Sequence, residues 1–162
     1  MAGHPGDDAG SDAPGLCRQK AMDLLARRPH FRAELATKLA RRGFESEVVS
    51  ATCDWLEGLS YLDDRAAAER LVRGALARKG YGPLRMRAEL VRRGVTGDVI
   101  DHTLAEAWKD GEDRRALEVA RARAESRGFD RGRIGRHLGS KGYGAAAIRR
   151  ALERVGKELG ES

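Results

Sequence analysis

Apolar residues recur at helical spacing in the stretch 61–95, in two runs separated by a glycine-containing turn. Asp63 and Asp64 precede the first run and are suited to cap the free N–H groups of a helix. Gly80 follows that run and can take the positive φ that ends a helix, and Pro83 suits the first turn of the next one. The apolar members of the first run are Ala66, Ala67, Ala68, Leu71, Val72, Ala75 and Leu76. The stretch therefore predicts two short helices joined by a tight, basic turn.

The same pattern occurs three times, at constant offsets of 51 and then 48 residues. The matched residues are Leu35, Leu39, Gly43, Phe44, Val49, Cys53 and Leu56, then Met86, Leu90, Gly94, Val95, Ile100, Leu104 and Ala107, then Ile134, Leu138, Gly142, Tyr143, Ile148, Leu152 and Val155. A glycine followed by an apolar residue at the same register in all three copies indicates an internal repeat.

The repeat predicts an all-α fold: an elongated array of three tandem three-helix repeats with helix-turn-helix-like units. We expect repeats at 16–60, 61–110 and 111–162, with helices of the last repeat at about 112–127, 131–141 and 144–158. Three small helices bury their apolar faces poorly alone, so neighbouring repeats are expected to extend one core. No segment shows the alternation of a strand, so no strands are predicted.

Composition adds the expected setting. Residues 1–15 contain no Lys or Arg and almost no bulky apolar side chain, so they are predicted to form a disordered tail and not a secretory signal. Cys17 and Cys53 have no metal-ligand spacing, and Cys53 occupies an apolar position of the repeat. We therefore expect buried, reduced thiols, a cytoplasmic protein and no membrane span. The net charge of +6 favours an acidic partner.

Three sequence segments resemble the RecX family, the bacterial regulators of the RecA recombinase. They are YLDD at 61–64 with RKGYGPLRMRAELVRRGV at 78–95, RRPHFRAELATKLARRGF at 27–44, and SRGFDRGRIGRHLGSKGYGAAAIRRAL at 126–152. Ala67, Phe31 and Ser60 depart from the family pattern, since an aromatic, a small hydroxyl residue and a glycine are common there. The resemblance implies binding to the RecA filament on single-stranded DNA, with inhibition of filament growth, ATP hydrolysis and strand exchange in recombination and DNA repair.

The predicted partner-binding residues are basic side chains around the second and third turns. They are Lys79, Arg85, Arg87, Arg92, Arg93, Arg127, Arg131, Arg133, Lys141, Arg149 and Arg150. For Arg92, Arg93 and Lys141, at helix C-termini, stabilisation of the helix dipole explains the charge equally well. Arg85, Arg131 and Arg133 lie near helix starts, where the dipole disfavours cations, so binding is the better explanation there.

Catalysis finds no support in the sequence. There is no HExxH, P-loop or GxSxG motif and no Cys/His cluster with zinc spacing, so we expect neither an enzyme nor a bound cofactor or metal. Two alternatives remain beside the resemblance: a helix-turn-helix protein that binds DNA directly, and a helical adaptor for another partner. Against the first, the predicted third helices of the first two repeats are rich in Asp and Glu, which phosphate repels. A monomer is expected.

Overall fold

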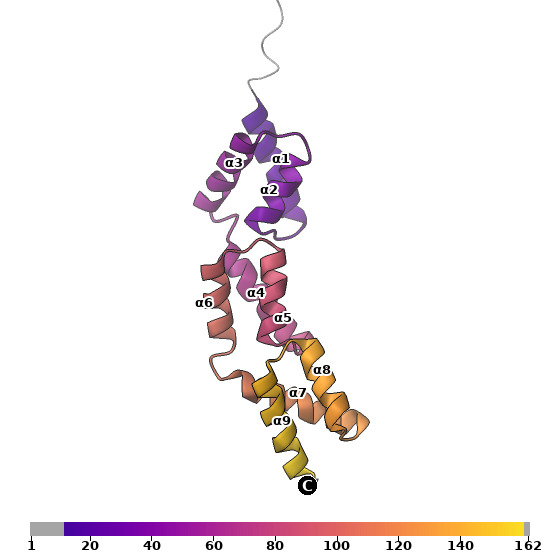
Figure 1. The fold of residues 1–162 in the computed structure, drawn as a ribbon. Helices are drawn as coiled ribbons and strands as arrows, with labels where there is room; N and C mark the ends of the chain where they lie inside the picture. The colour runs from indigo at the N-terminus through magenta and orange to yellow at the C-terminus, as the bar shows by residue number, and fades with distance from the viewer. Residues whose placement is uncertain (1–11, 161–162) are drawn as a thin grey trace, which may run out of the picture. The chain divides into compact units, whose positions relative to one another are not determined.

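The computed structural model describes residues 12–160, and within them the chain forms helices and no strand (Figure 1). The helices are α1 (Ala13–Arg27), α2 (Arg32–Ala40), α3 (Ser46–Gly58), α4 (Asp64–Lys79), α5 (Pro83–Arg92), α6 (Gly97–Ala107), α7 (Glu112–Arg127), α8 (Arg131–Lys141) and α9 (Ala145–Glu158). The all-α prediction is confirmed. Across the described residues no helix combines the length and the apolar character that a membrane crossing requires.

The repeat is visible in both backbone and core. Gly43, Gly94 and Gly142 all have positive φ, at 89°, 75° and 88°. The apolar residues four positions before them, Leu39, Leu90 and Leu138, are fully buried. The helices of each copy therefore end and pack at the same register, as the repeat predicts.

By its internal contacts the chain divides into two compact units, Met1–Ala67 and Ala68–Ser162, with the boundary inside α4. The predicted borders of three separate repeats remain a prediction. The predicted tail is too long at its C-terminal end, because α1 begins at Ala13 with Pro14 in its first turn, where a missing N–H costs no hydrogen bond. Residues 1–11 of that tail lie outside the described residues.

The first unit packs α1, α2 and α3 around one apolar core. Cys17 and Cys53 are free thiols within it, and burial raises the pKa of Cys53. Asp63 caps α4 through the N–H of Ala66, at 2.9 Å, as expected. Asp64 instead accepts the N–H of Arg32 at 2.7 Å, so it caps the start of α2.

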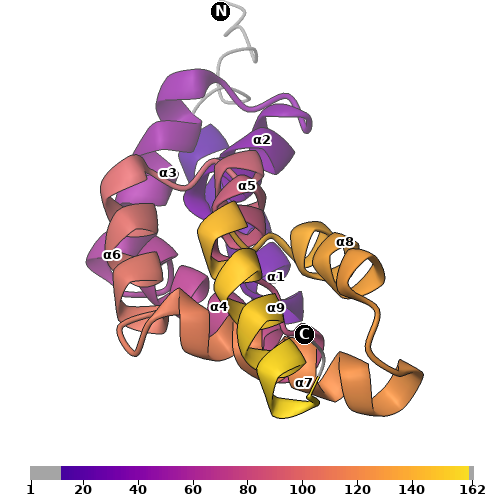
Figure 2. The same cartoon turned by 60° about the horizontal axis from the view of Figure 1, so that its bottom comes forward.

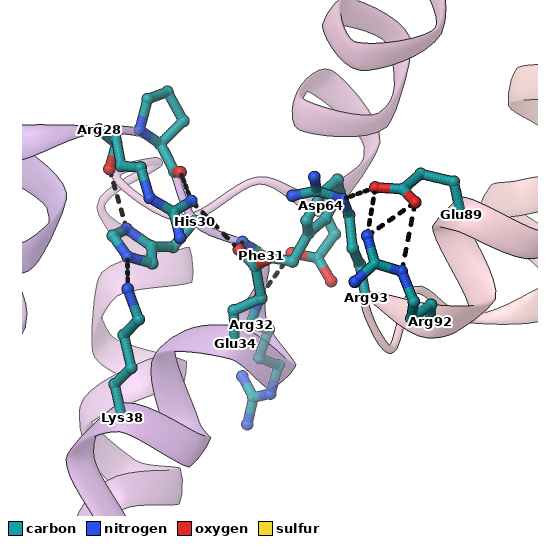
Figure 3. A network of polar contacts seen from close by, with 11 residues as sticks. Arg28, His30, Phe31, Arg32, Glu34, Lys38, Asp64, Glu89, Arg92 and Arg93 are labelled. Carbon is teal, nitrogen blue, oxygen red and sulfur yellow. Dashed lines mark hydrogen bonds and ion pairs between the residues drawn. The ribbon is translucent and has the colours of Figure 1, made fainter. Parts of the chain in front are cut away.

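His30 forms a small polar network at the start of α2 (Figure 3). Its Nδ1 lies 2.9 Å from the carbonyl oxygen of Arg28, and its Nε2 lies 2.8 Å from the ammonium of Lys38. Because the ammonium can only donate, Nε2 must accept, and the ring is neutral in this arrangement. Burial of the side chain, helped by the charges of Arg28 and Lys38, lowers the pKa of His30.

This lowered pKa makes the first unit sensitive to acid. A histidine kept neutral in the folded state binds protons more readily when the chain is unfolded. The contribution of His30 to the stability of the first unit is therefore complete above pH 6.5 and is lost as the pH falls toward the folded-state pKa. We expect the urea midpoint of α2, followed by its amide NMR signals, to be lower at about pH 5 than at about pH 7.5. The His30→Gln variant should lose part of this difference, whereas the exposed His102 of α6 can be replaced by Gln without changing it. Equal differences in wild type and H30Q would contradict the assignment.

Ser60 is the one non-glycine residue with positive φ among those described, at 59°. A left-handed conformation costs a residue with a Cβ about 1–2 kcal/mol. Part of any gain from glycine is offset by about 0.4–1 kcal/mol of unfolded-state entropy. Replacing Ser60 by Gly should therefore stabilise the first unit by about 0.5–1 kcal/mol in urea unfolding.

A matched control for this change lies on α3. Ser50 is exposed in the middle of that helix, where glycine costs about 0.5–1 kcal/mol relative to alanine. Ser50→Gly should thus shift the same transition in the opposite direction. If both variants lose stability, the conformation of Ser60 is not a source of strain.

In the second unit, α5 packs on α6, and α7, α8 and α9 pack on one another. The latter three are drawn from orange to yellow in Figure 2. Ala116, Ala120 and Ala124 are buried against the larger side chains of α8 and α9, such as Leu138 and Leu152. Glu112, at the start of α7, accepts the N–H of Gly144 at 2.6 Å and so caps α9. This packing fixes the C-terminal end of α8 for the contacts described next.

Candidate interface for an anionic partner

The C-terminal end of α8 meets the N-terminal end of α5 (Figure 1). The N–H of Gly82 donates to the carbonyl of Lys141 at 2.8 Å, and that of Leu84 donates to the carbonyl of Gly142 at 3.1 Å. These are groups that a helix end leaves without an internal partner, so each end satisfies the other. The opposite dipole ends also attract. We call this contact the α5–α8 junction.

A third helix end is bonded to the same place. The hydroxyl of Tyr143 donates to the carbonyl of Gly80 at 3.1 Å, just beyond α4. Burial raises the pKa of Tyr143 to about 12, so the phenol keeps the proton that it donates. The turns after α4 and after α8, which the repeat pattern identified separately, are thus joined in the structure.

Three of the predicted cations gather around the ring of Tyr81 at this junction. The guanidinium carbon of Arg85 lies 4.1 Å from the ring centroid, and the ammonium groups of Lys79 and Lys141 lie 5.4 Å from it. Each distance is within the range of a cation–π contact. We call Tyr81, Lys79, Arg85 and Lys141 the Tyr81 cluster.

Two of the three cations of the Tyr81 cluster are held by carbonyl groups. Arg85 donates to the carbonyl of Ser140 at 2.8 Å, and Lys141 donates to that of Lys79 at 2.7 Å. No carboxylate of the described residues forms an ion pair with Lys79, Arg85 or Lys141. A carbonyl orients a cation without neutralising it, so the cluster keeps its full positive charge for an external anion.

Most of the other predicted arginines are instead paired with carboxylates. Arg87 pairs with Asp101, Arg92 and Arg93 with Glu89, Arg133 with Asp130, and Arg150 with Asp113. Figure 3 shows the group on Glu89. Burial alone would raise the pKa of Glu89, but hydrogen bonds from Arg92 and Arg93 outweigh it and lower the pKa. These arginines are partly neutralised, which leaves less charge for a partner.

Arg127, Arg131 and Arg149 are exposed, and none forms an ion pair with another described residue. They lie at the end of α7, the start of α8 and the first turns of α9. The structure therefore groups Lys79, Arg85 and Lys141 into one cluster and leaves these three outside it.

Two residues of this region were absent from the sequence prediction. Tyr81 lies at a repeat position that holds His30 in the first copy and Phe129 in the third, so a ring at constant register was the available signal. Arg123 is on α7, near the Tyr81 cluster, and the residues at its position in the first two copies of the repeat are Leu24 and Ala75. No repeated signal marked it, because the charge occurs in one copy only.

Comparison with known proteins places the chain in a family. Models of the RecX first and second three-helix domains match residues 17–56 and 63–104. The chain is 38% identical over 144 residues to a "Regulatory protein RecX" of Pseudomonas savastanoi pv. phaseolicola, covering 87% of this chain and 92% of that relative. It is 37% identical over 146 residues to the protein of the same name from Pseudomonas fluorescens, with the same coverage.

Solved structures show the same fold. The crystal structure of RecX from Lactobacillus salivarius superposes with a TM-score of 0.79 at 19% identity, covering 89% of this chain and 97% of that one. A second crystal structure of regulatory protein RecX gives a TM-score of 0.75 at 21% identity over 94% of this chain and 81% of that one. The two domain models and the similarity along most of the sequence agree with the resemblance that its motifs indicate: the chain belongs to the RecX family of regulatory proteins.

Proposed function

We propose that this protein binds the RecA filament on single-stranded DNA and inhibits its extension, its ATPase activity and strand exchange. Family membership supports a regulatory role. The resemblance of the sequence motifs to the RecX family implies RecA as the partner. The observation that carries the proposal is the Tyr81 cluster, in which Arg85 and Lys141 have carbonyl partners and none of the three cations has a carboxylate partner among the described residues. We propose Lys79, Arg85 and Lys141 as the central contacts.

The charge of the cluster fits such a partner. A nucleoprotein filament presents DNA phosphates and acidic protein side chains, and unneutralised cations are attracted to both. The filament also repeats its subunits, so several weak contacts from successive helix groups would act together. We infer that the chain works by binding and not by catalysis, and the arginines outside the cluster would add to the affinity at longer range.

Direct reading of DNA by a helix-turn-helix is the weaker alternative. The third helices of the first two copies, α3 and α6, expose Glu47 and Asp98, which would lie against phosphate in a major-groove complex. In α9, Arg150 is paired with Asp113. These charges favour binding through the Tyr81 cluster. They disfavour insertion of a third helix into the major groove of a DNA duplex.

The test is the DNA-dependent ATPase rate of RecA filaments preformed on single-stranded DNA. The protein is added at a substoichiometric ratio, and a parallel reaction contains excess DNA. We expect the ATPase rate to fall in both reactions, because a protein that recognises the filament itself does not need unoccupied DNA to bind. No inhibition at any ratio would overturn the proposal. Inhibition that excess DNA abolishes would also overturn it, and would favour direct DNA binding.

A further inference from the structure

An open pocket of about 280 Å³ lies beside the Tyr81 cluster, between the end of α4, the face of α7 and the end of α8. Its apolar floor includes Val119 and Ala122. Its charged and polar lining consists of Lys79, Arg123, Ser126, His137 and Lys141, and no carboxylate is among the lining residues. The pocket can hold several waters or a small polar group, since one water occupies about 30 Å³ in the liquid.

The pocket concentrates positive charge from three helices. Lys79 and Lys141 end α4 and α8, where a cation offsets the helix dipole, so their presence alone needs no ligand. That explanation does not extend to Arg123, because it lies a full turn before the end of α7. Burial, together with the charges of Arg123 and Lys141, lowers the pKa of His137, which lines the same pocket.

Arg123 occupies a position that the other copies fill with apolar side chains. Its counterparts Leu24 and Ala75 are both buried. The Nε–H of Arg123 is itself buried and has no hydrogen-bond acceptor among the described residues. A long arginine can bury its aliphatic stem and extend its head to water, but that arrangement does not leave a donor buried and unpaired.

We propose that this pocket binds a phosphate group through Arg123, Lys79 and Lys141. A phosphate offers several acceptor oxygens and at least one negative charge, which matches converging donors better than a single carboxylate does. Lys141 uses one ammonium hydrogen on the carbonyl of Lys79 and keeps two for a ligand. The guanidinium of Arg123 lines the pocket and forms no ion pair with another described residue, so its charge would act on the bound phosphate.

The phosphate could come from a polynucleotide backbone or from a free nucleotide or ion, because the recognition chemistry is shared. The inference concerns the chain alone and does not rest on filament regulation. Its test contains no RecA, so its failure and that of the proposed function are distinguishable. If the backbone is the source, the pocket would explain how the Tyr81 cluster engages DNA in a complex.

The test is a titration of the full chain at low salt with three probes: inorganic phosphate, a 5′-mononucleotide, and a short single-stranded oligonucleotide without terminal phosphates. Calorimetry gives the affinity, and the ring signals of His137 in NMR report whether the probe occupies the pocket. The key variant is Arg123→Gln. The matched control is Arg114→Gln, which removes the same charge from α7 at an exposed site paired with Glu118.

At least one probe should shift the His137 signals, and its affinity should fall about tenfold or more in R123Q and less than about twofold in R114Q. The probe that binds most tightly identifies the source of the phosphate. The proposal is overturned if no probe shifts the His137 signals, or if both variants lose affinity equally, since net charge alone would then account for binding. Urea unfolding of each variant, with a midpoint near that of wild type, confirms that R123Q is folded.

Discussion

Replacing Gly142 by alanine should destabilise the second unit by about 2–5 kcal/mol. Gly142 has a φ of 88°, which costs a residue with a Cβ about 1–2 kcal/mol. An added Cβ would also lie 2.5 Å from the backbone nitrogen of Arg85 and 2.9 Å from its Cα. Overpacking of this kind adds about 1–3 kcal/mol, because backbone atoms cannot rotate out of the way. Urea unfolding followed by the amide NMR signals of α9 measures the loss.

Alanine variants of three other glycines distinguish the conformational cost of positive φ from the steric cost of the added Cβ. Gly43, the counterpart of Gly142 in the first copy, has a φ of 89° and nothing within 4 Å of an added Cβ, so Gly43→Ala, followed in the first unit, should show the conformational cost alone. Gly82 has a negative φ, and its added Cβ would lie 2.7 Å from the nitrogen of Tyr143, so Gly82→Ala should show the steric cost alone. Gly97 has neither feature, and its alanine variant should be nearly neutral. Equal losses at Gly142 and Gly43 would mean that the α5–α8 junction is not close-packed.

The fold was largely predictable because its signals are local. A helix end depends on the residues next to it, so glycine, proline and the spacing of apolar residues placed α7 and α8 at their observed bounds. The prediction was wrong at the other end of the chain, because the lack of basic and bulky apolar residues assigned Pro14 to the tail, whereas it lies in the first turn of α1. Asp64 was assigned as a cap for its own helix, and it caps α2 from a distance of 32 residues in sequence.

The candidate site was less predictable because its signals are not local. The repeat pattern treats Gly43 and Gly142 as equivalent helix ends, yet a Cβ on Gly43 would meet nothing within 4 Å whereas one on Gly142 would overlap α5. Likewise, the sequence places Arg85 and Arg87 on the same predicted helix. It cannot show that Arg87 pairs with Asp101 and that Arg85 donates to a carbonyl group. The tertiary arrangement alone distinguishes a neutralised arginine from one that is available to a partner.

Removal of the cations that have no carboxylate partner should have a large effect on inhibition of RecA. Replacing Arg85 and Lys141 together by glutamine should raise the concentration needed for half-maximal inhibition of the RecA ATPase by about tenfold or more. Hydrogen bonds that involve a charged group contribute about 1.5–3 kcal/mol each, and about 1.4 kcal/mol is a tenfold change. The backbone hydrogen bonds from Gly82 to Lys141 and from Leu84 to Gly142 do not use these side chains, so the α5–α8 junction should persist without their charge. Measurement of the inhibition curve at two salt concentrations should show a weaker salt dependence in the double variant.

The matched control is the pair Arg87→Gln and Arg150→Gln, which removes the same two charges from exposed arginines paired with Asp101 and Asp113. Because those carboxylates already offset the arginines, this double variant should lose less than about threefold in inhibition. If both double variants lose the same amount, net charge controls binding and the Tyr81 cluster has no special role. If neither loses inhibition, the partner contacts another face of the protein. A tenfold loss confined to the first pair would locate the contact at Tyr81, where cations held by carbonyl groups keep the charge that the paired arginines do not.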